Sequence, residues 1–125
     1  MHLQTQPRIF VVEDNLIYQA LIGKELESLT SDIYFYTKGE SCIQDLDMNP
    51  SIVILDYNLD GEINGLDTLQ EIRKHNSDIY VILFSNQKEL NSKENMVQYG
   101  QFRFLEKREH SFQMLKKLIN STFFS

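Results

Sequence analysis

Three carboxylates stand directly after two short apolar runs of the sequence. Glu13 and Asp14 follow residues 9–12, and Asp56 follows residues 52–55. Carboxylates held within a few ångströms of one another repel unless a cation joins them, and a hard divalent ion with oxygen ligands suits such a group. If the fold brings these three side chains together, we expect them to bind Mg²⁺.

A hydroxyl group and an ammonium group hold comparable positions. Ser85 follows residues 79–84, and Lys107 lies just beyond residues 102–105. Phosphoryl transfer depends mainly on positioning the phosphoryl group and neutralising its oxygens, and these side chains could help with both. The predicted chemistry is nucleophilic attack by the Asp56 carboxylate, which would carry the phosphoryl group as an acyl phosphate.

Each of these residues also has an ordinary structural interpretation. Glu13 and Asp14 could be loop or helix-start charges, and Asp56 could be only a turn-former. Ser85 could cap the following helix, and Lys107 could be a surface lysine. We favour the functional interpretation because all these ordinary roles would have to coincide at one edge of one sheet.

The elements that would position these residues are strands alternating with helices. Short apolar runs rich in β-branched and aromatic residues are separated by segments of helical length and spacing. This alternation predicts an α/β fold in which a parallel sheet carries helices on both faces, joined by right-handed crossovers. Ligands bind such a sheet at the carboxyl ends of its strands. The predicted strands are residues 9–12, 33–36, 52–55, 79–84 and 102–105.

Specific residues indicate the first and last helices. Asn15 is placed as the N-cap of a first helix, in which Leu16 and Ala20, and Ile17 and Leu21, are spaced four residues apart. The last helix carries an apolar stripe made of Phe112, Leu115, Leu118, Ile119 and Phe123.

The segment between the last two predicted strands differs from the others. Residues 86–99 offer few apolar side chains at helical spacing. We therefore expect a helix here that is either weakly held to the sheet or merely solvated. A weakly held helix has low local stability, as elements that move usually do.

The composition is that of one ordinary globular domain. The chain has 125 residues, of which 42% are hydrophobic and 24% charged, and this is enough to form a core without disulfides or structural metal. We expect a single domain over residues 1–125 with its core at about 8–123. The net charge of −6 argues against direct binding of nucleic acid, which needs clustered Lys and Arg.

Other features bear on the compartment. No apolar run approaches the roughly 20 residues of a membrane span, and the N-terminal residues lack the apolar core of a signal peptide. Cys42 is the single cysteine, so no internal disulfide can form, and we expect a small buried apolar residue there. These features predict a soluble, cytoplasmic protein that does not bind a membrane.

Taken in order, these residues resemble the receiver domains of two-component response regulators, from about Arg8 to Phe123. Each matching piece is common by itself, but the ordered set is specific to that family. The pieces are Val11-Val12-Glu13-Asp14-Asn15, Lys38-Gly39-Glu40-Ser41, Ile54-Leu55-Asp56-Tyr57-Asn58-Leu59, Asn64-Gly65-Leu66, Leu83-Phe84-Ser85 and residues 100–107.

The resemblance implies a fold and a site. The fold would be the flavodoxin-like, doubly wound (βα)5 arrangement with a five-stranded parallel sheet in the order 2-1-3-4-5. Asp56 would accept the phosphoryl group. Glu13, Asp14 and Asp56 would hold Mg²⁺ together with the backbone carbonyl of Asn58.

The resemblance also implies a conformational switch. Ser85 would take the switch hydroxyl position and Lys107 the phosphate-contacting position. Phe104 would take the aromatic switch position, with a plain core phenylalanine as an equal alternative. Phosphorylation would favour an active conformer and change a surface at about residues 87–123, where an output domain or partner protein could bind.

The same resemblance implies partners for the protein, although one residue departs from the family pattern. The phosphodonor would be a histidine kinase or a phosphotransfer protein, and the protein would be a monomer or a phosphorylation-dependent dimer. Arg108 follows Lys107 where the family often has proline after a cis bond. A cis bond before a residue other than proline costs about 3–4 kcal/mol, so the peptide bond between Lys107 and Arg108 could be trans. A trans bond would alter the placement of Lys107.

We therefore expect a phosphorylated signalling switch in a two-component phosphorelay and not an enzyme that turns over an external metabolite. The main alternative is a receiver-like module that works by protein contact without phosphorylation. An aspartyl-phosphate phosphatase would have a second Asp two residues after a nucleophile on the first strand, whereas Glu13-Asp14 is followed by Asn15-Leu16. A flavin carrier would need a phosphate-binding loop there, and two carboxylates would repel phosphate.

Overall fold

A single parallel sheet organises the protein. The structure, a computed structural model, describes residues 6–59, 61–85, 102–108 and 110–123. The five strands lie in the order β2-β1-β3-β4-β5, and every neighbouring pair is parallel. The predicted sheet and strand order are therefore confirmed. The strands are β1 Ile9–Val12, β2 Ile33–Tyr36, β3 Ile52–Leu55, β4 Tyr80–Ser85 and β5 Phe102–Glu106.

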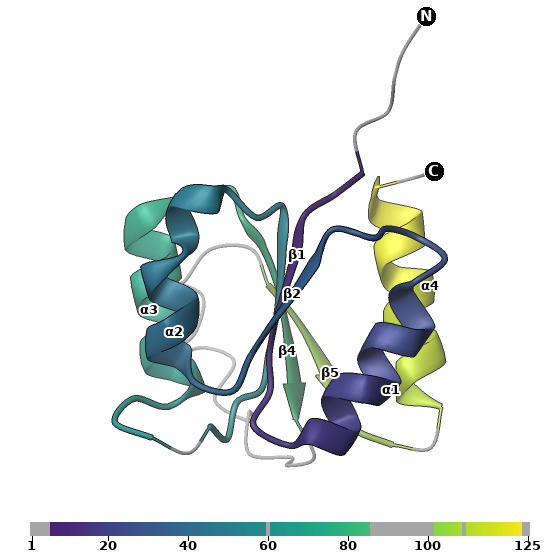
Figure 1. The fold of residues 1–125 in the computed structure, drawn as a ribbon, viewed down its shortest axis with the longest axis horizontal. Helices are drawn as coiled ribbons and strands as arrows, with labels where there is room; N and C mark the ends of the chain where they lie inside the picture. The colour runs from purple at the N-terminus through teal and green to yellow at the C-terminus, as the bar shows by residue number, and fades with distance from the viewer. Residues whose placement is uncertain (1–5, 60, 86–101, 109, 124–125) are drawn as a thin grey trace, which may run out of the picture.

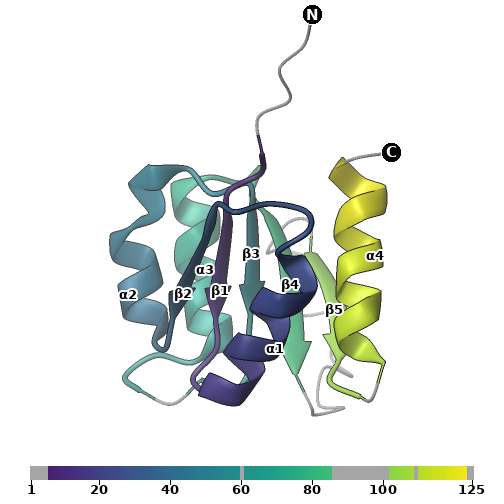
Figure 2. The same cartoon turned by 45° about the vertical axis from the view of Figure 1, so that its right-hand side comes forward.

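Helices cover both faces of the sheet (Figure 1). One face carries α1 and α4, which Figure 2 shows side by side, and the other carries α2 and α3. None of the helices in the described ranges is long and apolar enough to cross a membrane. The helix predicted within residues 86–99 lies outside the described residues. The bounds are α1 Leu16–Leu26, α2 Gly39–Gln44, a 3-10 turn Leu46–Met48, α3 Gly65–His75 and α4 Ser111–Phe123.

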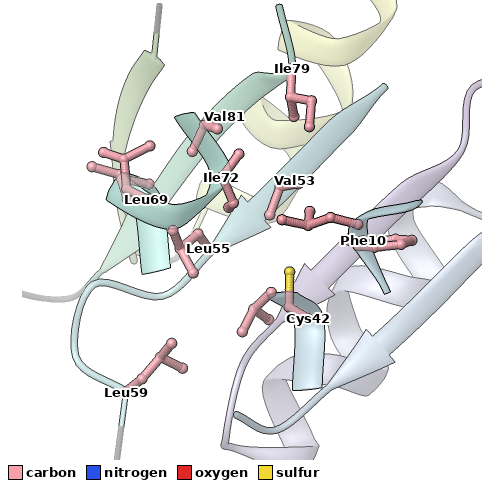
Figure 3. Packing of buried hydrophobic residues seen from close by; sticks show 12 residues of the cluster. Phe10, Cys42, Val53, Leu55, Leu59, Leu69, Ile72, Ile79 and Val81 are labelled. Carbon is pink, nitrogen blue, oxygen red and sulfur yellow. The ribbon is translucent and has the colours of Figure 1, made fainter. Parts of the chain in front are cut away.

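Alternate strand residues belong to two separate cores, because successive side chains of a strand point to opposite faces. Figure 3 shows the core on the side of α2 and α3, where Leu69 and Ile72 pack against strand residues such as Val53 and Leu55. Covering on both faces explains the nearly continuous apolar runs of β1, β3 and β4. The core on the side of α1 and α4 contains Ile9, Val11, Ile22, Leu26, Ile52, Ile54, Ile82, Phe84, Leu115 and Ile119.

Cys42 belongs to the core between the sheet and α2. Its side chain is fully buried, and burial raises the pKa of the thiol to about 12, with a smaller contribution from the nearby Asp45 charge. The thiol therefore remains protonated and behaves as a small apolar group, as predicted from the sequence.

The first helix turns an unexpected face to the sheet. Its buried residues are Ile22 and Leu26, whereas Leu16, Ile17 and Leu21 are 67%, 70% and 44% exposed. The four-residue spacing therefore predicted a helix correctly but did not identify its core face. The reason is that apolar residues lie all around α1, so their spacing does not select one side.

Candidate functional site

The three predicted carboxylates meet at the carboxyl ends of β1 and β3. These strands are neighbours with Val12 opposite Leu55, so the residues that follow them are brought together. Glu13, Asp14 and Asp56 each place an oxygen within 4.8 Å of the others. Glu13 and Asp56 are buried, and Asp14 is partly exposed. The acidic cluster expected from the sequence is therefore present.

Lys107 reaches into this cluster from the end of β5. Its Nζ lies 2.6 Å from Glu13 Oε1 and 3.4 Å from Asp56 Oδ2, and its backbone N–H donates to the Ser85 carbonyl at 2.7 Å. The side chain is only 6% exposed, so it is not a surface lysine. The described residues contain no cis peptide bond, and the bond from Lys107 to Arg108 is accordingly trans.

Asn58 connects the Asp56 loop to the end of β4. Its backbone N–H donates to Asp56 Oδ1 at 3.0 Å, and its side-chain amide donates to Ser85 Oγ at 3.1 Å. The sequence directed attention to the carbonyl of Asn58 and gave no indication of the contact made by its amide. Ser85 is fully buried, and the helix that it would cap in the alternative interpretation lies outside the described residues.

The start of α1 holds Glu13 in place. Asn15 caps the helix, as predicted, by accepting hydrogen bonds from the N–H groups of Ile17 and Tyr18, and its own N–H donates to Glu13 Oε2 at 3.0 Å. The Gln19 side chain donates to the Glu13 carbonyl at 2.7 Å. Gln19 was not predicted from the sequence, where its only signal is its place five residues after Asp14 in the predicted first helix.

The electrostatics of Glu13 favour a cation at this site. Burial raises the pKa of Glu13 to about 7, the Lys107 hydrogen bond and the Asn15 N–H oppose that rise, and the Asp56 charge adds to it. An ionised Glu13 is thus incompletely compensated by the protein alone. Three carboxylates whose negative charge is not fully balanced match the ligand preferences of Mg²⁺, which binds oxygen donors.

Phe104 lies on β5, opposite Leu83 of β4. It is half-buried and packs against the core on the side of α2 and α3. It also borders a groove of about 670 Å³ between β5 and the start of α4, whose described lining residues are Phe104, Leu105, Glu106, Arg108, His110, Ser111 and Met114. This placement is compatible with both of the interpretations made from the sequence.

Gly65 permits the close approach of α3 to the Asp56 loop. A Cβ at Gly65 would meet the Asp56 carbonyl oxygen and would lie 2.6 Å from Tyr57 Cα. Because both obstacles are backbone, we expect Gly65→Ala to lower the free energy of unfolding by about 1–3 kcal/mol, the usual cost of overpacking. Urea denaturation of the two proteins measures this difference.

Gly23→Ala is the matched control for that prediction. A Cβ at Gly23 would meet only the far end of the Phe35 ring, at 2.9 Å, and a flexible ring tip can move aside. We expect its free energy of unfolding to stay within about 1 kcal/mol of wild type, since alanine is also the better helix former. Equal losses in both variants would show that the Gly65 contact has no special importance.

One curated protein has a related sequence over part of its length. The chain is 29% identical over 114 residues to a protein-glutamate methylesterase/protein-glutamine glutaminase from Clostridium acetobutylicum; the match covers 87% of this chain but only 33% of that protein. The chain thus spans about a third of the length of this relative.

Solved structures are similar over nearly the whole chain. The signal receiver domain of a putative Luxo repressor protein from Vibrio parahaemolyticus has a TM-score of 0.83 and 26% identity, covering 95% of this chain and 91% of that one. The response regulator protein TrrA from Thermotoga maritima, in complex with Mg²⁺-BeF, has a TM-score of 0.79 and 28% identity, covering 92% and 97%.

The match to a family description decides the assignment. Residues 9–119 match the response regulator receiver domain, and this span includes both strands that carry the acidic cluster, the Asp56 loop and the end of β5. Together with the strand order 2-1-3-4-5, it shows that the chain belongs to the response regulator receiver domain family.

Proposed function

We propose that this protein is a phosphoacceptor in a two-component phosphorelay, in which Asp56 takes a phosphoryl group in a Mg²⁺-dependent reaction. The observation that carries the proposal is the meeting of the Glu13, Asp14 and Asp56 oxygens within 4.8 Å of one another, with the Lys107 ammonium 3.4 Å from Asp56. A buried acidic cluster of this kind has a cost in stability, and metal-dependent phosphoryl transfer is a function that would maintain it.

Each residue has a distinct proposed role in the transfer. An Asp56 oxygen attacks phosphorus, the bond from phosphorus to the donor breaks, and the donor leaves with the bonding electron pair. When bound by Glu13, Asp14, Asp56 and the Asn58 carbonyl, Mg²⁺ would supply positive charge against the phosphoryl oxygens. The Lys107 ammonium, 3.4 Å from Asp56 Oδ2, would contact a phosphoryl oxygen.

Ser85 is proposed to sense the modification. Its hydroxyl lies at the end of β4 and accepts a hydrogen bond from the Asn58 amide, and the Asn58 backbone N–H in turn donates to Asp56 Oδ1. A phosphoryl oxygen could accept a hydrogen bond from that hydroxyl and so favour a second conformer of the neighbouring backbone. Phe104 on β5 and the groove beside it lie within the surface at about residues 87–123 where we propose that an output domain or partner protein binds.

Phosphorylation by a small donor is the direct test of the function. Incubation with acetyl phosphate and Mg²⁺ should add the mass of one phosphoryl group to the intact protein. The adduct should be absent with EDTA and in Asp56→Asn. No adduct on the folded wild-type protein would contradict the proposal and support a module that acts by protein contact alone.

The raised pKa of Glu13 predicts how stability depends on pH. In the metal-free protein the folded state retains the proton up to about pH 7, whereas an ordinary glutamate loses it near 4.5. The unfolded chain therefore ionises first, and the free energy of unfolding should fall as the pH rises from about 4.5 to about 7. Urea denaturation across this interval should show a smaller fall in Glu13→Gln.

Mg²⁺ supplies the complementary measurement for Glu13. Metal and proton compete for the same carboxylate, so Mg²⁺ should stabilise the wild-type protein more above pH 7 than near the lower end of the interval. A stabilisation by Mg²⁺ that did not change with pH would place the metal away from Glu13.

The exposed face of α1 is proposed as the contact for the phosphodonor protein. Leu16 and Ile17 are 67% and 70% exposed and come directly after the acidic pair, so an apolar surface lies beside the reactive carboxylate. We expect Ile17→Ser to slow transfer from an autophosphorylated histidine kinase by about 5- to 30-fold, the effect of removing a binding hot spot of 1–2 kcal/mol. Transfer from acetyl phosphate should be unchanged, because that donor needs no docking surface.

Phe123→Ser is the control for the docking prediction. Phe123 is also a large exposed apolar residue, but it is the last residue of α4. It therefore lies at the end of that helix that is farthest from Lys107. The variant should leave transfer from both donors unchanged. If Ile17→Ser slowed transfer from both donors equally, the substitution would be acting on the site itself and not on docking.

A further inference from the structure

The Lys107 ammonium group lies over an aromatic ring that belongs to a different element. Lys107 Nζ is 4.4 Å from the centroid of the Tyr18 ring on α1 and 5.6 Å from that of Phe84 on β4. Phe112 on α4 braces both rings, with centroids 5.9 Å from Tyr18 and 5.4 Å from Phe84. The lysine therefore has carboxylates at its tip and aromatic rings along its side.

The face of an aromatic ring attracts a cation because the ring quadrupole is negative there, and the attraction is significant within about 6 Å of the centroid. The four-carbon stem of lysine is flexible, so a contact that restricts its rotamers also determines where the ammonium group lies. Tyr18 reaches Lys107 because side chains of a helix lean towards its N-terminus, and Tyr18 lies one turn after Asp14.

We propose that Tyr18 is a positioning residue that holds the Lys107 ammonium within reach of the phosphoryl group on Asp56. The inference rests on the proposed phosphoacceptor function and adds a residue to that site. A cation joining the carboxylates would weaken the hold of Glu13 on Lys107, which is an ion pair of 2.6 Å. The ring contact does not compete with a metal, so it keeps the ammonium near Asp56 when the ion pair loosens.

The backbone of Lys107 is fixed separately, and this leaves the side chain as the part that Tyr18 controls. Its N–H donates to the Ser85 carbonyl at 2.7 Å. Beyond it, the buried Ser111 hydroxyl donates to the Glu106 carbonyl and accepts from the Arg108 N–H, which ties together the residues on either side of Lys107. Loss of the Tyr18 ring should therefore release the ammonium without unravelling the loop.

The first experiment observes Lys107 directly in the metal-free protein. With ¹³C-labelled lysine, the protons on Cε of Lys107 should be shifted upfield by the ring current, and this signal should be absent from Lys107→Arg. Tyr18→Phe retains the ring and should retain the shift. Tyr18→Leu should move the signal towards the position of exposed lysines, with a smaller shift left by the Phe84 ring, whereas Tyr80→Leu, the same change where the ring packs against Phe123, should leave it in place.

The second experiment measures the rate of phosphorylation by acetyl phosphate in Mg²⁺. Tyr18→Phe and Tyr80→Leu should stay within about twofold of wild type, and Tyr18→Leu should be slower by about 3- to 10-fold, the range expected for one partly desolvated cation–π contact. Thermal unfolding identifies a variant that fails to fold. In that case Tyr18→Met, whose flexible side chain fills irregular space, takes the place of Tyr18→Leu.

The outcomes separate the two proposals. A wild-type protein that is not phosphorylated contradicts the proposed function, whatever the spectrum shows. A folded Tyr18→Leu that is phosphorylated as fast as wild type overturns the positioning role and leaves the function intact. A slower Tyr18→Leu with an unmoved Lys107 signal also overturns it, because the loss would then not act through Lys107.

Discussion

Replacing Asp56 with asparagine should abolish phosphorylation and at the same time raise the free energy of unfolding of the metal-free protein. The three carboxylates lie within 4.8 Å of one another, and within the described part of the chain Glu13 and Asp56 share the single Lys107 ammonium. Removing one charge should stabilise the fold by about 1–3 kcal/mol, between the repulsion of two such charges in water and at a protein surface. The asparagine side chain would still occupy the same space, and Lys107 would keep its contact with Glu13.

The prediction is checked by urea denaturation in EDTA and in Mg²⁺. In EDTA the variant should be more stable than wild type, and in Mg²⁺ the difference should shrink or reverse, because the metal removes the repulsion only where it binds well. Asp47→Asn is the matched control. Its side chain is 96% exposed, so the change should stay within about 0.5 kcal/mol. A less stable Asp56→Asn in EDTA would show that Asp56 is held by favourable contacts and not under repulsion.

Such an effect would mean that the site works against the stability of the fold. The strands beneath it follow the ordinary rules, with apolar residues covered on both faces, whereas the residues directly after β1 and β3 are buried carboxylates. Local rules are commonly broken at functional sites and offset by the surrounding structure. Here the offset comes from Lys107 and from the N–H groups of Asn15 and Asn58.

The fold could be predicted because its signals are local and strong. Residues 9–12 and 52–55 are continuous apolar runs, and both proved to be central strands buried on both faces. The alternation of strands and helices predicted that Glu13 and Asp56 lie at the same edge of the sheet, since parallel strands end at one edge. The strand order, which makes β1 and β3 neighbours, was implied by the family resemblance.

The unpredicted features depend on how α1 packs. Ile17 and Leu21 have the spacing of a buried stripe but are exposed, because Ile22 and Leu26 supply an equally apolar side for the core. Only the rotation of the helix about its axis determines which of these faces is buried. The same rotation brings the Tyr18 ring to Lys107, a residue near the other end of the sequence. No local pattern encodes a contact of that kind. The amide contact of Asn58 with Ser85 does not involve α1, but it too joins residues far apart in the sequence and has no local pattern.

Replacing Lys107 with methionine should have the second large effect. The change retains the apolar stem and removes the charge, so the rate of phosphorylation by acetyl phosphate should fall by about 10²- to 10³-fold, as when one preorganised donor is removed from a transition state. The free energy of unfolding in EDTA should fall by up to about 3–5 kcal/mol, because Glu13 would be left as a buried carboxylate without its partner. The loss should be smaller below pH 7, where Glu13 retains its proton.

A second substitution distinguishes an unpaired charge from lost packing. Glu13→Gln combined with Lys107→Met leaves two neutral side chains where the ion pair of 2.6 Å stood, so the double variant should be more stable than Lys107→Met alone. The interaction energy from the four proteins should be about 0.5–3 kcal/mol, as for residues in direct contact. The double variant should nevertheless be at least as slow in phosphorylation as the single one, because restoring stability does not restore the ammonium and Glu13→Gln also removes a proposed Mg²⁺ ligand. Recovery of the rate together with the stability would show that Lys107 matters only for the fold.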